Sequence, residues 1–215
     1  PFDSGMMENS LNTGGVIPLT QPYNADPWNY AGPESVAAIP NPDVIDWVLI
    51  ELRDAPDAAS AGSAAIVAQQ AAFVLNDGSV VALDGSSDLS FDISVSHSLF
   101  VVVWHRNHLA IMSASPLTEV GGIYSYDFSG GAGQVYGGIL AHKEIEPGLW
   151  GMVAADGNAD GQVNNADKNN IWSIQAGTGG YLAGDFNLNI QVNNSDKNEL
   201  WVPNSGSGGQ VPASP

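Results

Sequence analysis

The chain has 215 residues and a net charge of −18, from 5 Lys and Arg against 23 Asp and Glu, and it has no cysteine. This charge would repel phosphate-rich partners, so we expect no nucleic-acid binding, and the lack of cysteine excludes disulfides, zinc–thiolate sites and cysteine nucleophiles. The longest strongly apolar run, 99–104, is far shorter than the roughly 20 residues that cross a bilayer, so no membrane insertion is expected.

Residues 1–42 are rich in proline and turn residues and are expected to wrap a sheet as an extended segment. The first strong strand is 44–53, where apolar residues occupy both faces. The Ala-rich stretch 64–72 fits helix or strand by propensity. The hairpin that follows it, with Asp77-Gly78 at the turn, favours strand.

Four further strands are expected before residue 130. Apolar and polar residues alternate in 89–95, which is typical of a strand with one wet face, and 99–104 is expected as a central strand. Shorter candidates lie at 110–112 and 122–128. Short strands at this density predict a mainly β fold, an antiparallel β-sandwich of jelly-roll or Ig-like type over residues 1–150.

After residue 150 the sequence repeats with a period of 29, as the recurrence of Asp156 at Asp185 and of Trp172 at Trp201 shows. Two twelve-residue segments carry oxygen-bearing side chains at positions 1, 3, 5, 9 and 12, which is the spacing of a calcium loop whose position 7 adds a backbone carbonyl. The expected ligands are Asp156, Asn158, Asp160, Gln162, Asn164 and Asp167 in the first segment and Asp185, Asn187, Asn189, Gln191, Asn193 and Asp196 in the second.

Two Ca²⁺ ions are therefore expected, and the second should bind more weakly. Asn189 replaces a carboxylate at position 5, and Ile190 replaces the glycine that permits a sharp turn at position 6. Val163 and Val192, at position 8, are expected to pair the two loops through a short β-like contact. Each loop should lead into a helix of about two turns that places its tryptophan in a small shared core.

With Asp at position 12 and no helix before the loop, the repeats from Asp156 to Trp201 resemble the duplicated calcium repeats of type I dockerins. The resemblance implies a small α-helical calcium-binding pair at 151–203. Dockerins bind cohesins through positions 10 and 11, and the residues there, Asn165-Ala166 and Asn194-Ser195, lack the Ser/Thr pairs common in that family. The whole chain also resembles C-terminal modules of large secreted bacterial surface proteins.

Other candidate sites have ordinary structural alternatives. His105 and His108 could bind a metal or act in catalysis, but no third ligand is evident, and packing at a strand end is favoured. Glu51 and Asp54 beside Arg53 could be a carboxylate pair, with a surface ion pair favoured. Four aromatic residues could form a sugar-stacking platform, with core packing favoured; they are Trp28, Tyr30, Trp47 and Trp104.

These features predict a non-enzymatic protein. The first hypothesis is an extracellular, calcium-stabilised structural protein that assembles with copies of itself into a filament, tube or surface layer, through the β domain and the terminal segments. A Gly/Ser/Pro tail, 204–215, needs a partner surface to be ordered. The alternatives are a carbohydrate-binding or adhesion module of a larger protein, with glycans as partners, or a dockerin-type docking module. The start at Pro1, with no initiator Met or leader, indicates a mature secreted or cell-surface protein.

Overall fold

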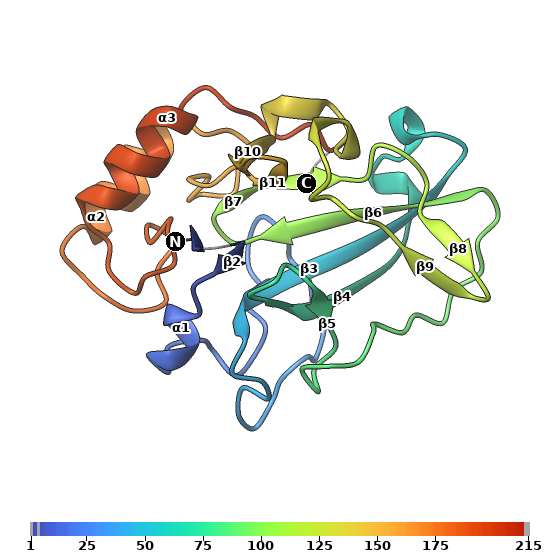
Figure 1. Ribbon diagram of the computed structural model, residues 1–215, viewed down its shortest axis with the longest axis horizontal. Helices are drawn as coiled ribbons and strands as arrows, with labels where there is room; N and C mark the ends of the chain where they lie inside the picture. Colours follow the sequence, from blue (N-terminus) through green and yellow to red (C-terminus); the bar gives the residue numbers. More distant parts are fainter. Residues whose placement is uncertain (1, 4, 213–215) are drawn as a thin grey trace.

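A computed structural model describes residues 2–3 and 5–212 of the chain. The fold is mainly β, and its centre is a five-stranded antiparallel sheet with the strand order β5-β4-β3-β6-β7 (Figure 1). The strands are β3 (Val44–Ala55), β4 (Ile66–Leu75), β5 (Val80–Val81), β6 (Ser98–His105) and β7 (His108–Met112). The strands predicted at 44–53 and 99–104 and the hairpin at Asp77-Gly78 are confirmed. Of the Ala-rich stretch 64–72, residues 66–72 lie in β4 and the first two lie in a 3₁₀ turn.

Both faces of this sheet are buried, which explains why its central strand has apolar residues on both sides. In β3, Trp47 and Leu49 belong to the core on one face, and Val48, Ile50 and Leu52 belong to the core on the other. We call these the first and the second face. A strand covered on both sides has no need of polar residues at alternate positions, so its hydrophobic run is continuous.

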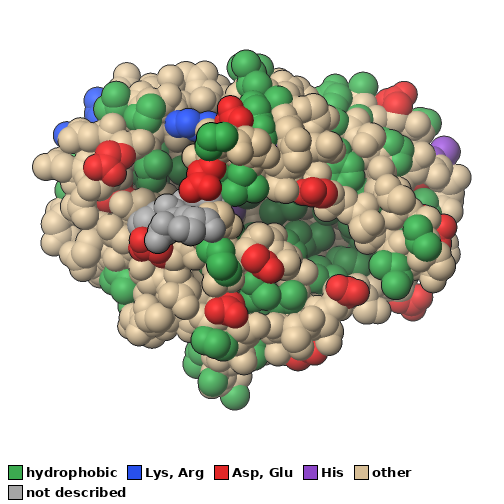
Figure 2. Space-filling model, in the orientation of Figure 1, with side chains coloured by type: hydrophobic (Ala, Val, Ile, Leu, Met, Phe, Trp, Pro, Cys, Tyr) green, Lys and Arg blue, Asp and Glu red, His purple; other side chains and the backbone are tan. Residues whose placement is uncertain are grey.

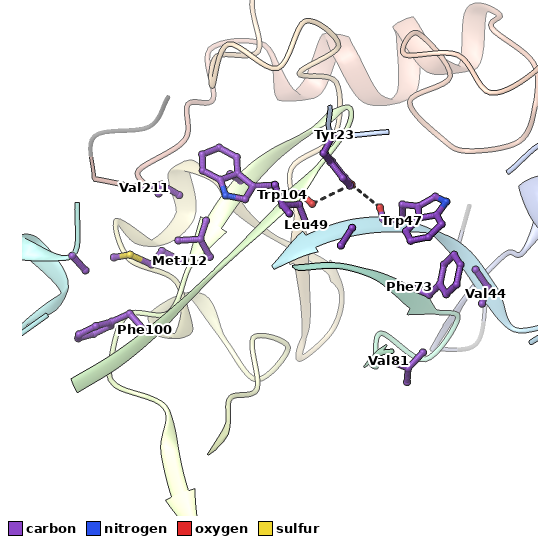
Figure 3. Packing of buried hydrophobic residues seen from close by; sticks show 14 of the residues in the cluster. Tyr23, Val44, Trp47, Leu49, Phe73, Val81, Phe100, Trp104, Met112 and Val211 are labelled. Atoms are coloured by element: carbon purple, nitrogen blue, oxygen red, sulfur yellow. Dashed lines mark hydrogen bonds between the residues drawn. The ribbon is translucent and has the colours of Figure 1, made fainter. Parts of the chain in front are cut away.

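The N-terminal segment covers the first face, as expected for residues 1–42. Helix α1 (Ser10–Thr13) places Leu11 in this core, and Tyr23 donates hydrogen bonds to the backbone oxygens of Trp47, at 2.8 Å, and Trp104, at 3.4 Å (Figure 3). Strands β1 (Phe2–Asp3) and β2 (Met6–Met7) form a short hairpin beside it. Because Tyr23 bonds two neighbouring strands, it fixes the segment across the sheet.

Loops and short hairpins cover the second face, and the prediction of a strand at 89–95 is wrong. Leu89, Phe91, Ile93 and Val95 do alternate onto the second core, but the segment makes no ladder with a neighbouring strand. Met152 adds to this layer from the hairpin of β10 (His142–Glu146) with β11 (Leu149–Met152), whereas β8 (Thr118–Val120) and β9 (Ile123–Ser125) form a hairpin whose residues are all exposed. Of the predicted 122–128 strand, only Ile123–Ser125 forms. A jelly-roll or Ig-like sandwich is not confirmed.

The remaining helices are short. Four single 3₁₀ turns are η1 (Ala58–Ser60), η2 (Ser63–Ala65), η3 (Ala132–Gln134) and η4 (Gly138–Leu140). Each C-terminal repeat has a π-helical stretch that continues into an α-helical turn: η5 (Asp167–Trp172) with α2 (Ser173–Gln175), and η6 (Asp196–Trp201) with α3 (Val202–Asn204). In Figure 1 these two helices lie together at one end of the sheet. Within the described ranges, no helix is long and apolar enough to cross a membrane.

Two expectations about charged and C-terminal residues need correction. Arg53 is fully buried and its Nη2 lies 2.6 Å from Glu51 Oε1, so this pair is internal and not on the surface. Asp54 instead accepts the backbone N–H groups of Ser96 and His97. The segment 204–212 is packed onto the molecule, with Val211 in the first core, and residues 213–215 of the predicted tail lie outside the described residues.

Candidate metal centre

The first predicted calcium loop, 156–167, is closed by bonds from its side-chain oxygens to its own amides. The Asp156 carboxylate accepts the N–H groups of Asp160 at 3.1 Å and Gly161 at 3.0 Å. Asp167 reaches back from the other end to accept the N–H groups of Asn158 at 3.2 Å and Asn164 at 2.8 Å. Because positions 1 and 12 both bond inward, the first and last carboxylates lie on the same small loop.

The second loop, 185–196, repeats this pattern atom for atom. Asp185 accepts the N–H groups of Asn189 at 3.0 Å and Ile190 at 2.8 Å. Asp196 accepts those of Asn187 at 3.1 Å and Asn193 at 2.8 Å. Two segments that share one hydrogen-bond framework present their oxygens in the same way, so a ligand that fits the first loop meets an equivalent arrangement in the second.

The backbone turns in both loops require left-handed residues at positions 4 and 6. The φ angles are 55° and 81° at Ala159 and Gly161, and 59° and 79° at Leu188 and Ile190. A β-branched residue in this region costs about 1–3 kcal/mol, so the strain predicted at Ile190 is present in the second loop. The Ile190 side chain packs against Gly14, just after α1, where a Cβ would overlap it. That packing offsets part of the strain.

Four carboxylates of the loops are buried: Asp156 is 2% exposed, and Asp167, Asp185 and Asp196 are 0% exposed. Burial, and then the neighbouring Asp167, raise the pKa of Asp156 to about 7, while burial raises the pKa of Asp185 to about 6. Burial also raises the pKa of Asp167 and of Asp196. Among the described residues, none of the four forms a salt bridge. Buried carboxylates without a cation favour either a proton or a bound metal ion.

The donor set suits a hard cation that prefers oxygen. Asp156 Oδ1 and Asn158 Oδ1 converge on the N–H of Asp160, at 3.1 and 3.3 Å, so positions 1 and 3 lie side by side. Position 9 is different, because Asn164 Oδ1 accepts the N–H of Ala166 at 2.7 Å and so acts on the helix start. Within the described ranges, no three His, Cys, Asp or Glu side chains form a metal-binding group. A loop of this kind relies on amide and backbone oxygens as well as carboxylates.

The predicted β-like contact between the loops is wrong in its partners. Val163 exchanges backbone bonds with Ser207 and Gly206, at 2.9 and 2.8 Å, and these residues follow the second helix. Val192 makes the equivalent bonds with Thr178 and Gly177, which follow the first helix. Both valines are fully buried as expected. Each loop therefore pairs with the segment that leaves the other repeat, a reciprocal arrangement that the period alone did not reveal.

The two tryptophans of the repeats follow the same reciprocal rule. Trp172 Nε1 donates to the backbone oxygen of Asn193 at 2.8 Å, and Trp201 Nε1 donates to that of Asn164 at 2.7 Å. Lys197 lies over the Trp172 ring and Lys168 over the Trp201 ring, 4.7 and 4.8 Å from the centroids. The helix of each repeat thus fixes the predicted calcium loop of the other. In Figure 2 the few basic side chains in view lie toward the end of the molecule that carries these helices.

Sequence reasoning missed a buried network centred on Asp46. Its carboxylate accepts hydrogen bonds from Arg106 Nε at 2.9 Å and Tyr181 Oη at 2.6 Å, and lies 3.2 Å from His105 Nε2. Burial opposes ionisation of Asp46, but Arg106 and His105 outweigh it and hold the pKa well below its usual range. His108 is half-buried, and desolvation lowers its pKa. The rings of His105 and His108 contact each other edge to face at the β6–β7 turn, with their centroids 4.6 Å apart.

Asn107, at the tip of the same turn, joins the β domain to the start of both loops. Its side chain donates to the backbone oxygens of Ala183 at 3.1 Å and Asp185 at 2.8 Å, and its own backbone oxygen accepts the N–H of Ala155 at 3.0 Å. Arg106 also donates to the backbone oxygen of Leu182. The residues that begin each loop are therefore held by one fully buried asparagine.

Of the aromatic residues considered for sugar stacking, Trp47 is fully buried in the core of the first face, so core packing accounts for it. Comparison of this chain with protein-family models, curated proteins and solved structures found no match.

Proposed function

We propose that this protein is an extracellular, non-enzymatic structural module, which two Ca²⁺ ions hold in shape and which assembles with copies of itself. One observation carries the calcium assignment: two loops with the same hydrogen-bond framework bury four carboxylates, none of which forms a salt bridge with a described residue. Calcium takes six to eight oxygen ligands, and side chains at positions 1, 3, 5 and 12 with a carbonyl at position 7 provide them. The proposal includes a sandwich-type β domain at 1–150 and a dockerin-like pair at 151–203.

The second site is proposed to be the weaker one. The first loop has three carboxylates, Asp156, Asp160 and Asp167, whereas the second has two. Because calcium affinity follows ligand charge, the second loop should fill at a higher calcium concentration. Extracellular calcium modules work with dissociation constants of about 10⁻⁴–10⁻³ M. Weak sites of this kind suit a protein that functions outside the cell.

Self-assembly is proposed from apolar surface that has no evident use in the monomer. Val120, Ile123 and Tyr124 of the β8–β9 hairpin are 72%, 64% and 41% exposed. Ile66 and Val67 are exposed at the start of β4, beyond the two-residue β5, and this part of the edge is open to an added strand. Further along the edge, the backbone groups of Gln69 and Ala71 are bonded to side chains of the N-terminal segment. Both arginines are buried, which leaves three lysines against 23 acidic residues. Contacts between copies must therefore be apolar, main-chain or bridged by metal ions.

Calorimetric titration of metal-stripped protein with CaCl₂, followed by electron microscopy with calcium and with chelator, tests both parts. We expect two binding events and ordered assemblies only with calcium. Asp156→Asn and Asp185→Asn should each remove one event, and Asp92→Asn, an exposed residue that changes the charge equally, should remove neither. Val120→Ser with Ile123→Ser should block assembly and leave both events intact. Absence of calcium uptake would refute the metal assignment, and monomers under all conditions would refute assembly alone.

A further inference from the structure

The layer over the first face of the sheet has an opening. Trp28 of the N-terminal segment borders a cavity of about 240 Å³, with residues of β3, β4 and β6 as its floor. The polar lining consists of Trp28, Trp104, Glu51, Arg53, Gln69 and Ser63. A packed protein interior leaves few voids larger than a water molecule, so this space is unlike a core defect. Its volume is smaller than the about 300–1,000 Å³ of pockets that bind drug-sized ligands, which indicates a smaller occupant.

The charged residues of the cavity are already paired with protein groups. Glu51 Oε1 accepts Arg53 Nε at 2.7 Å, and Glu51 Oε2 accepts Gln69 Nε2 at 2.7 Å. Arg53 Nη1 donates to the backbone oxygens of Ala61 and Pro212, at 2.7 and 2.8 Å. An occupant therefore needs no charge of its own. The net charge of −18 also acts against an anionic one.

The tryptophans of the lining supply hydrogen-bond donors that the protein does not use. Trp28 Nε1 and Trp104 Nε1 are both buried, and neither has a hydrogen-bond partner among the described residues. Buried indole N–H groups normally find an acceptor, and an unpaired one costs about 1–3 kcal/mol. Because Gln69 uses its amide nitrogen on Glu51, its amide oxygen remains as an acceptor. The cavity thus combines aromatic surface with an acceptor, and its two tryptophans carry buried donors that have no partner among the described residues.

We propose that this cavity binds one residue of an uncharged glycan. A sugar ring has apolar C–H surface that matches indole, and hydroxyl groups that can both accept from the tryptophans and donate to Gln69. Ser63 and the 36% exposed Ile66 lie at the open side, where the rest of a glycan chain could leave. No residue that lines this cavity belongs to a calcium loop, although Trp28 and Trp104 also border the space beside Asp156 and Asp160. The inference goes beyond the proposed function and does not depend on it.

Titration of the calcium-loaded protein with neutral hexasaccharides of glucose, xylose and mannose, followed by calorimetry and tryptophan fluorescence, tests the inference. At least one should bind. Trp28→Ala and Gln69→Ala should each weaken that binding at least tenfold, while Trp150→Ala, which lies in β11 and does not line the cavity, should leave it unchanged. Calcium titration of each variant checks that it is folded. If Trp28→Ala does not fold, Gln69→Ala still tests the inference. Failure of all three sugars to bind, binding that neither variant weakens, or preference for a peptide or a polyuronate would overturn the inference and leave the calcium assignment standing.

Discussion

Calcium removal should reverse the dependence of stability on pH. In the metal-free protein, the pKa values of Asp156 and Asp185 are about 7 and about 6, while both carboxyls titrate near 3.8 in the unfolded chain. Between these values the folded state binds more protons than the unfolded state, so stability falls as pH rises. From pH 5 to pH 8 the loss is about 4 kcal/mol for the two groups, at 1.36 kcal/mol per pKa unit. A chain of this size should lose about 8–16 °C in Tm.

With saturating calcium the order should be opposite. A bound cation favours the ionised carboxylates, so its stabilisation is full at pH 8 and is lost as protons displace it toward pH 5. The assay is a thermal melt at both pH values, in chelator and in calcium. Since approach to the isoelectric point near 4.1 also reduces self-repulsion, Asp156→Asn is the critical variant. In chelator it should lose about two thirds of the pH effect, whereas Asp92→Asn should keep it. Metal-free protein that melts at the same temperature at both pH values would refute the reasoning.

Two further predictions concern coupling between elements. Trp201→Phe, in the second repeat, removes the bond to the Asn164 backbone oxygen and should weaken calcium binding by the first loop about fivefold, for about 1 kcal/mol; Trp172→Phe should weaken the second loop likewise. Calorimetry separates the two sites when one loop is inactivated: Asp185→Asn leaves only the first loop to bind, and Asp156→Asn leaves only the second. If each tryptophan variant weakened only the loop of its own repeat, the reciprocal contacts would be contradicted. Asn107→Ala removes the side-chain bonds to Asp185 and to Ala183, just before the second loop, but spares the backbone bond to Ala155, so it should weaken the second loop more than the first. Equal weakening would show that Asn107 does not position the second loop.

The sequence predicted local features well where one short-range rule decides them. The continuous apolar run of β3 and the Asp77-Gly78 turn each formed as expected, because burial on both faces and a tight hairpin leave few alternatives. The alternation in 89–95 was also real as a burial pattern. The segment is not a strand, because alternating burial requires only that one side of the chain lies on the core. A strand also needs a hydrogen-bonded neighbour, and the periodicity of the sequence does not show whether one is present.

Contacts between distant parts of the chain could not be predicted from the sequence. Glu51 and Arg53 look like surface residues by composition, but a sheet covered on both faces buries them, and they are stable there because they satisfy one another. In the Asp46 network, His105 and Arg106 are separated from Asp46 by 59 and 60 positions of the sequence, and no spacing rule predicts that they meet. The partner of Val163 was missed for the same reason. A position in a loop indicates that a backbone group must be paired, but it does not identify the partner.

These long-range contacts decide how a calcium-stabilised fold would behave as one unit. An ion in the first loop would order Val163 and Asn164, which hold the segment after the second helix and the tryptophan within it. That helix begins in the second loop, whose first residue is held by Asn107 of the β domain. Each loop therefore restrains an element that the other depends on, and ordering one lowers the entropic cost of ordering the other. The two ions should bind with positive cooperativity, and their loss should destabilise the end of the central sheet as well as the repeats.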